Sequence, residues 1–384
     1  MPLADADRRE IVELATGLDP SSPAIVTRPR RRSKSHRLPR EAPPRRSIAL
    51  RRRQPMRIDV HSHLFPRCFW RGARDHGSWY GGRVIEEGGE RYVETAERRA
   101  GPVEPLWDTS LDQRLAEMDR RRVDIHVLST PPHFFHYTLP AADALASSRE
   151  INDEFADAVA SHPDRFRGLA TVPLQDTSAA IAELERAMAN GLAGAEIATH
   201  VDGRNLDDPV LFPFFEAAQQ LGAFLFVHPN APVVGPRTPR YHLSNLVGFP
   251  VETTIAVASM LLGGVLERLP ELTICFSHGG GYALFGVPRW DRGYAVHPDA
   301  ASVAAAPPSD GLRHIYVDSM VFGDRELRHV VESVGADRVL MGSDYPFTMG
   351  ADDSVGFVGG VSVLDEATRT AILGGTAARL LGIG

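Results

Sequence analysis

Residues 57–63 read RIDVHSH, a short apolar segment that ends in two histidines separated by one serine. Residues i and i+2 of a strand lie on the same face, so His61 and His63 can point together beyond the end of a strand. Taken alone, the His-x-His spacing is as typical of a polar strand end as of a metal site. The segment therefore predicts a strand, and the role of its histidines depends on the rest of the chain.

Seven further apolar segments follow, separated by polar stretches with helical periodicity. They read DIHVLST (124–130), FRGLATV (166–172), AGAEIAT (193–199), AFLFVHP (223–229), LTICFSH (272–278), IYVDS (315–319) and RVLMGSD (338–344). Alternating strands and helices are the pattern of a parallel sheet. Eight such units favour a closed (βα)8 TIM barrel over an open doubly wound sheet. We therefore predict an α/β fold of the barrel class.

Two segments depart from this alternation. Residues 64–109 interrupt the first unit with many Gly, Trp and charged residues, which predicts a long first βα loop over the barrel mouth. Residues 1–55 contain a Pro-, Arg- and Ser-rich stretch without apolar periodicity, which is typical of disorder. We expect a disordered basic N-terminal extension over 1–55 and one TIM-barrel domain over 56–384.

Composition limits the partners. The chain has 42 Lys and Arg against 49 Asp and Glu, a net charge of −7, and residues 28–53 hold twelve basic residues and one acid. The barrel is therefore strongly acidic and would repel phosphate backbones, so we expect no nucleic-acid partner for it. Cys68 and Cys275 match no paired ligand spacing, and we found no apolar run of about 18 residues. We expect a cytoplasmic protein without a membrane span.

Ligand-type side chains also stand at the ends of other predicted strands. His228 follows AFLFV, His278 follows LTICFS, and Asp344 follows RVLMGS. Active-site groups of (βα)8 barrels come from the C-terminal ends of several strands. A satisfied histidine or a helix N-cap could explain any one of these residues, but not the whole set. We therefore predict that they meet in one site with the histidines of the first strand.

An ordered set of motifs resembles the decarboxylase-type branch of the amidohydrolase superfamily (amidohydrolase 2), and most closely the aminocarboxymuconate-semialdehyde decarboxylases. The resemblance extends from residue 56 to about residue 382. Its motifs are RIDVHSHLFPR, LWDTSLDQRLAEMD, TVPLQD, FVHP, LERLPELTICFSHGGG, YVDS and GSDYPF. The resemblance implies that His61, His63, His228 and Asp344 hold one divalent ion, Zn²⁺ first, with Mn²⁺ or Fe²⁺ also compatible. It implies that His278 is the general base that deprotonates a water molecule on that ion.

The resemblance also implies substrate-binding residues. Arg289 would bind a substrate carboxylate from across a homodimer interface, a task that suits a planar guanidinium. Tyr241 and Phe347 would be aromatic pocket residues. The alternatives are a solvent-facing Arg289 paired with Asp291, and simple packing for the two aromatic residues.

Several residues depart from the family pattern or stay unassigned. Asn230 stands where close relatives have a tryptophan after His-Pro. A second substrate arginine of the family falls on Gly101, and only Arg98 or Arg99 could replace it. These departures leave the exact substrate open. Three histidines that follow predicted strands have no assigned role: His133, His136 and His200.

We expect a metal-dependent carboxy-lyase, a non-oxidative decarboxylase of a small unsaturated or aromatic carboxylic acid. Two alternatives stay open. One is a metal-dependent hydrolase or hydratase that uses the same site on a lactone, amide or alkene. The other is a catalytically idle barrel that acts as a binding protein, although all four predicted ligands and the predicted base are present.

Overall fold

The computed structural model describes residues 56–232 and 237–384, and the statements below concern those ranges. The predicted extension over residues 1–55 lies outside the described residues, so the domain boundary at residue 56 stays a prediction.

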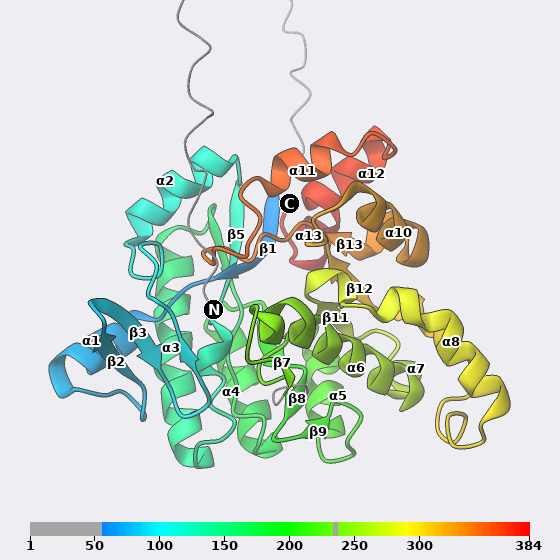
Figure 1. Ribbon diagram of the computed structural model, residues 1–384, viewed down its shortest axis with the longest axis horizontal. Helices are drawn as coiled ribbons and strands as arrows, with labels where there is room; N and C mark the ends of the chain where they lie inside the picture. Colours follow the sequence, from blue (N-terminus) through cyan, green and yellow to red (C-terminus); the bar gives the residue numbers. More distant parts are fainter. Residues whose placement is uncertain (1–55, 233–236) are drawn as a thin grey trace, which may run out of the picture. The chain divides into compact units, whose positions relative to one another are not determined.

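Eight parallel strands form the centre of the fold, each within one of the eight predicted segments (Figure 1). They are β1 (Ile58–His63), β5 (Ile125–Ser129), β6 (Phe166–Gly168), β7 (Gly194–Ala198), β10 (Phe224–His228), β11 (Thr273–Phe276), β12 (Tyr316–Asp318) and β13 (Val339–Leu340). One run of strands has the order β1-β5-β6 and the other β13-β12-β11-β10-β7. Bridges Ala170–Ala195 and Ser62–Tyr345 join the two runs. The sheet therefore closes on itself, and the predicted TIM barrel is confirmed.

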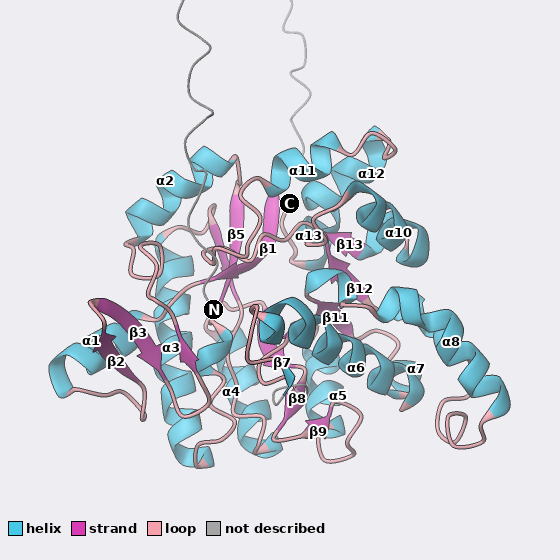
Figure 2. Cartoon of the chain, in the orientation of Figure 1, coloured by secondary structure: helices cyan, strands magenta, loops and turns pink. Residues whose placement is uncertain are grey.

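Helices pack around the strands, as Figure 2 shows in cyan against magenta. The helices before residue 230 are α1 (Arg67–His76), α2 (Leu111–Arg121), α3 (Ala141–Ser161), α4 (Thr177–Ala189) and α5 (Phe212–Leu221). The later ones are α6 (Phe249–Leu262), α7 (Val265–Arg268), α8 (Ala283–Val296), α9 (Pro308–Gly311), α10 (Asp324–Val334), α11 (Ser354–Gly360), α12 (Glu366–Thr370) and α13 (Thr376–Leu380). A short hairpin, β8 (His200–Val201) with β9 (Arg204–Asn205), follows β7.

The predicted first loop has secondary structure of its own. It contains α1 and a small antiparallel sheet of β2 (Arg83–Glu87), β3 (Glu90–Glu94) and β4 (Arg99–Ala100). Trp79 Nε1 donates to Glu150 Oε2 on α3 at 2.9 Å, and Phe65 stacks on Trp107 with ring centroids 4.5 Å apart. The first contact attaches the loop to α3 and the second joins the two ends of the loop, so its residues have defined positions above the strand ends.

Residues 244–262 form one helical stretch that is long and apolar enough to cross a membrane by length and hydropathy alone, contrary to our expectation that no such run exists. Core helices of soluble proteins pass the same test. Here 44% of the stretch is buried inside the protein, and Ala256, Val257 and Met260 of α6 are fully buried. We interpret α6 as a core helix of the barrel.

Helix α2 is positioned by a capping box and by one buried arginine. Ser110 Oγ accepts from Gln113 N, and Gln113 Oε1 accepts from Ser110 N, so the first turn is satisfied by its own sequence. Arg114, only 2% exposed, donates to His63 O at 2.7 Å, and to Ser62 Oγ and His126 Nδ1 at 3.2 Å. Burial lowers the pKa of Arg114 to about 10, so it is charged at neutral pH. Arg114 therefore fixes the C-terminal end of β1 through hydrogen bonds from inside the barrel.

Replacing Arg114 by Met removes all these donors while keeping the length of the side chain. We expect the free energy of unfolding to fall by roughly 3 kcal/mol, because buried acceptors without a partner cost about 1–3 kcal/mol each. Urea denaturation followed by circular dichroism measures the change. Arg120→Met is the matched control, since Arg120 is an exposed arginine of the same helix that pairs with Glu117. Equal losses in the two variants would contradict a supporting role for Arg114.

Candidate active site

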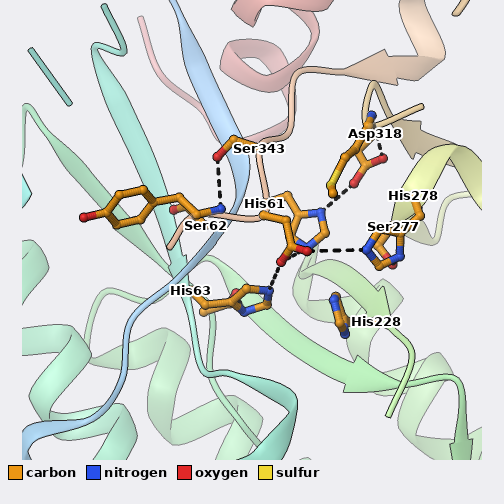
Figure 3. A network of polar contacts seen from close by, with 12 residues as sticks. His61, Ser62, His63, His228, Ser277, His278, Asp318 and Ser343 are labelled. Carbon is orange, nitrogen blue, oxygen red and sulfur yellow. Dashed lines mark hydrogen bonds and ion pairs between the residues drawn. The ribbon is translucent and has the colours of Figure 1, made fainter. Parts of the chain in front are cut away.

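Five side chains from four strands meet at the C-terminal mouth of the barrel. His61 and His63 belong to β1, His228 ends β10, His278 follows β11, and Asp344 follows β13. Figure 3 shows the imidazoles of the four histidines converging on one point. The ring centroids of His61, His63 and His228 are 5.0–5.1 Å from one another. The structure thus brings together all the residues predicted as metal ligands and the predicted base.

Asp344 lies at the centre of this group. Its Oδ1 is 3.2 Å from His61 Nε2 and 3.1 Å from His63 Nε2, and its Oδ2 is 3.8 Å from His278 Nε2. One donor atom each from His61, His228, His278 and Asp344 also lie within 4.8 Å of one another. Donor atoms this close can bind one shared cation.

In each of the three predicted histidine ligands, Nδ1, the ring nitrogen that points away from the centre of the site, makes a hydrogen bond. Nδ1 of His61 donates to Asp318 Oδ2 at 2.7 Å, Nδ1 of His63 donates to Thr130 O at 3.1 Å, and Nδ1 of His228 donates to Pro229 O at 2.8 Å. A hydrogen bond at Nδ1 fixes the tautomer that leaves the lone pair on Nε2. The three imidazoles are therefore oriented as nitrogen ligands.

The inner atoms, by contrast, have no hydrogen-bond partner. Nε2 of His61, His63 and His228 and Oδ1 of Asp344 are all buried and unsatisfied among the described residues. Buried polar atoms without a partner are costly, and a group of them at one point indicates a ligand. Three imidazole nitrogens and one carboxylate oxygen suit a divalent transition metal. The residues therefore fit the predicted metal.

Charge at the site agrees with cation binding. Burial opposes ionisation of Asp344, but His61, His278 and His63 outweigh it and hold its pKa well below the ordinary value. Burial likewise opposes protonation of His61, yet Asp344 and Asp318 raise its pKa to about 10. The carboxylates thus dominate the local potential, which favours a positive charge at the centre of the site.

His278 occupies a strained turn beside this centre. Its φ is 55°, in the left-handed region that is unusual for residues other than glycine, and Asp344 has a φ of 59°. Asp318 Oδ1 accepts from Gly279 N at 2.8 Å and so supports the turn, while His278 Nδ1 lies 3.1 Å from Ser277 Oγ. The side chain of His278 is 14% exposed, more than those of His61 and His63. Its imidazole can therefore meet a molecule in the adjoining cavity.

Two cavities adjoin the site, and Asp344 lines both. The first, of about 550 Å³, is largely apolar and includes His278, Tyr282 and Phe322 in its lining. The second, of about 480 Å³, lies under the first βα loop. Its lining includes Arg98, Trp107, His133, His228 and Phe347. A small organic molecule could reach the donor atoms from either cavity.

The predicted substrate-binding residues lie in different places. Phe347 lines the second cavity, with its ring centroid 5.4 Å from that of His63. Tyr241 is 72% exposed and Arg289 is exposed on α8, and neither lines either of the two cavities described above. Asp291 accepts from Ser309 N, and no ion pair joins it to Arg289 in the described part of the chain. The functional roles of all three residues, like those of the ligands and the base, stay predictions.

Two residues of the site had no role in the sequence-based prediction. Asp318, within the YVDS motif, orients His61 and the His278 turn; its position at the end of β12 was the available signal. His133 was left unassigned and lines the second cavity. Among the other unassigned histidines, His136 is buried against Ser147, and His200 lies beside Ala231 O.

Comparisons with known proteins agree with the geometry. A 2-amino-3-carboxymuconate-6-semialdehyde decarboxylase of Dictyostelium discoideum is 36% identical, over 85% of this chain and 92% of that protein. A protein with the same description from Caenorhabditis elegans is 30% identical, over 77% of this chain and 86% of its own length. The solved structure of 5-carboxyvanillate decarboxylase from Sphingomonas paucimobilis has a TM-score of 0.74 and 26% identity, and covers 86% of this chain and all of that one.

The sequence model of the Amidohydrolase family (Amidohydro_2) matches residues 58–383, which include every barrel strand and all five converging side chains. Together with the two relatives at 30% identity or more, this match shows that the chain belongs to the decarboxylase-type branch of the amidohydrolase family.

Proposed function

We propose that this protein is a metal-dependent, non-oxidative decarboxylase of a small unsaturated or aromatic carboxylic acid. The observation that carries the proposal is the set of oriented but unsatisfied donor atoms of His61, His63, His228 and Asp344, open to cavities of substrate size. Relatives that act on carboxymuconate and carboxyvanillate compounds support the substrate class. An acid related to aminocarboxymuconate semialdehyde is our first candidate.

The chemistry divides between the ion and the side chains. A divalent ion held by the three histidines and Asp344 would supply a Lewis acid at the end of both cavities. His278 would move the proton, because its Nε2 faces Asp344 and its imidazole reaches the cavity. Asp318 would fix the orientation of His61 and of the turn that carries His278, because it accepts a hydrogen bond from each. Phe65, Trp107 and Phe347 would exclude water beneath the first loop.

We further propose Zn²⁺ as the ion, with Mn²⁺ and Fe²⁺ as alternatives that the same ligands accept. We also propose a cytoplasmic location, which is supported by Cys68 and Cys275, both free and buried.

A homodimer is part of the proposal. Phe285 and Arg289 of α8 and Tyr282, the N-cap residue of that helix, are spaced by three and four residues, which places them on one side of the helix. Phe285 is 84% exposed, and Leu246 and Tyr241 are exposed as well. An exposed apolar surface of this kind is typical of an interface. A second copy bound there could receive Arg289 near its substrate.

Release of CO₂ tests the reaction. We expect protein loaded with Zn²⁺ or Mn²⁺ to release CO₂ from at least one member of a panel of amino- and hydroxy-substituted muconic and benzoic acids. His278→Asn should lower kcat by about 10²- to 10⁴-fold, since a general acid or base contributes that much. Asparagine is chosen because it tolerates a positive φ. His297→Asn, at an exposed histidine after α8, is the control. Hydration or hydrolysis of panel compounds without CO₂ would instead indicate the hydrolase or hydratase.

Metal analysis after dialysis tests the ligand set. We expect one equivalent of Zn²⁺ or Mn²⁺ per chain and a higher melting temperature with metal, because a ligand of the folded state stabilises it. Asp318→Asn should weaken metal binding by about 10- to 100-fold, as is usual for a residue that orients a ligand, and Asp344→Asn should weaken it more. Asp352→Asn removes a fully exposed carboxylate and should change nothing. Full metal content in Asp344→Asn would rule out that residue as a ligand.

Mixing two inactive variants tests the dimer. Arg289→Gln lacks the proposed partner-donated arginine, and His278→Asn lacks the proposed base. If Arg289 acts across a twofold interface, random mixed dimers have one complete site, and the mixture should regain about a quarter of wild-type activity. Phe285→Glu should convert the dimer to a monomer, as measured by sedimentation velocity. Activity that stays at the level of the separate variants, in dimers shown to exchange subunits, would contradict the shared site.

A further inference from the structure

His133 is a buried histidine without a partner on the wall of the second cavity. It lies in the short turn after β5, is 3% exposed, and lines the cavity together with His228 and Asp344. Neither of its ring nitrogens has a hydrogen-bond partner within residues 56–232 and 237–384. Buried polar atoms are nearly always paired, and an unpaired one is costly. An unpaired imidazole on a cavity wall therefore indicates a group that binds in the cavity.

Three aromatic side chains surround this imidazole. The ring centroids of Phe65, Trp107 and Phe347 lie 6.1–6.2 Å from that of His133. Trp107 and Phe347 also line the second cavity, and Trp107 is stacked on Phe65 with ring centroids 4.5 Å apart. Side chains packed in this way have little freedom to move. The position of the imidazole is therefore fixed before a ligand enters.

Trp107 supplies a second unpaired group on the same wall. It is 5% exposed, and its Nε1–H makes no hydrogen bond in the described part of the chain. A buried indole N–H usually finds an acceptor. The indole only donates, whereas a neutral imidazole donates at one nitrogen and accepts at the other. The His133–Trp107 pair thus lacks at least one acceptor atom that packing does not supply.

Both members of the pair are uncharged. Burial lowers the pKa of His133 well below its ordinary value, and the nearby Arg98 and His63 lower it further. A charged ligand atom among aromatic rings would lose its hydration without gaining an opposite charge from this pair. The pair therefore favours a neutral polar atom over an ion.

The two arginines of the loop above this wall pack on other rings. Arg98 lies over Phe249, with Cζ 5.3 Å from the ring centroid. Arg99 points the opposite way, where it lies over Tyr92 and pairs with Glu87. Neither guanidinium stacks on one of the three rings described above, so the unpaired nitrogens are the polar groups of that aromatic surface.

We infer that His133 and Trp107 form a recognition subsite for an uncharged oxygen substituent of the substrate, a hydroxyl or a carbonyl group. This inference rests on the proposed decarboxylase function and narrows its substrate class to planar acids that carry such an oxygen besides the carboxylate that leaves. A carbonyl oxygen can accept from both side chains, and a hydroxyl can accept from Trp107 and donate to His133. An amino group on a conjugated system is a poor acceptor, because its lone pair is delocalised, so it would leave the indole N–H unpaired.

The subsite selects substrates through the groups that a wrong substrate would leave unpaired. An acid with a methyl group in place of the oxygen would bury both side chains without partners, so it should bind less well. The oxygen substituent is retained when CO₂ leaves, and its hydrogen bonds are present in the ground state and in the transition state alike. We therefore expect the selection to act on binding and on kcat/KM more than on kcat.

Calorimetric titration with matched benzoic acids tests the subsite. The probes are 3- and 4-hydroxybenzoate, 3- and 4-formylbenzoate and, as apolar counterparts, 3- and 4-methylbenzoate, added to protein loaded with Mn²⁺. We expect at least one hydroxy or formyl acid to bind wild-type protein on the order of 10-fold more tightly than the methyl acid with the same substitution, as pairing a buried polar group provides. The two oxygen series show whether the subsite prefers a hydroxyl or a carbonyl group.

Two substitutions remove the unpaired groups one at a time. Trp107→Phe removes the indole N–H and keeps a ring that can stack on Phe65, and His133→Phe removes both imidazole nitrogens. Each should reduce the preference severalfold with little change in the binding of the methyl acids. Trp70→Phe is the matched control and should keep the preference, because Trp70 also has an unpaired, buried Nε1 but does not line the second cavity.

A conservative variant separates recognition from packing. His133→Gln keeps a donor and an acceptor, so it should retain part of the preference that His133→Phe loses. If His133 served only to fill space among the aromatic rings, phenylalanine would be tolerated better than glutamine and the preference would be unchanged in both variants. That result would contradict the inference.

The outcomes distinguish this inference from the proposed function. Wild-type protein that binds the methyl acids as tightly as both oxygen series overturns the subsite even if CO₂ release is found, and so does a preference that persists in His133→Phe and Trp107→Phe. A preference that depends on these two residues, in a protein that releases no CO₂ from any panel acid, supports the subsite and overturns the decarboxylase.

Discussion

The geometry of the site depends on one buried hydrogen bond, from His61 Nδ1 to Asp318 Oδ2 at 2.7 Å. It joins β1 to β12 past the intervening strand β13, and both side chains are completely buried. The same carboxylate accepts from Gly279 N and Met320 N, so it also positions the turn that carries His278. Without Asp318, His61 could rotate and the His278 turn would lose its support. The Asp318 carboxylate therefore positions both a predicted metal ligand, His61, and the turn that carries the predicted base, His278.

The positions of these side chains are well defined because the parallel strands end at the same edge of the barrel. Buried hydrogen bonds inside the barrel also fix the strand ends. Arg114 fixes the end of β1 through His63 O and Ser62 Oγ, and Ser343 donates to Asp59 beneath the site. Burial raises the pKa of Asp59 to about 6, even though Ser343, His61 and Arg114 act in the opposite direction. These polar groups are inside the barrel, where hydrogen bonds are strong and an unpaired group is costly. The interior thus tolerates a charged arginine and several carboxyl groups because they form one connected set.

The first βα loop supplies many of the residues that line the second cavity. The barrel strands and the five converging side chains form the centre of the site, and the loop supplies further groups that line the second cavity. Its antiparallel strands and aromatic contacts hold Trp107 above the strand ends, and the Glu97–Asn230 hydrogen bond connects it to β10. Side chains on loops are held less precisely than those on helices and strands, so these contacts are what fix the positions of the loop residues. Differences in substrate among members of the family are therefore expected to arise here.

The sequence alone was sufficient for the eight strands, because short apolar segments between amphipathic helices are a local pattern. It also placed five ligand-type residues at strand ends, and the closure of the sheet then brings those ends together. Local pattern was not sufficient for the contacts between distant segments. The folded state of the first loop, the opposite directions of Arg98 and Arg99, the isolation of His133 and the burial of Arg114 all depend on packing between residues far apart in the chain. Periodicity records which face of an element is apolar, but only the tertiary structure decides which polar side chains are left inside without a partner.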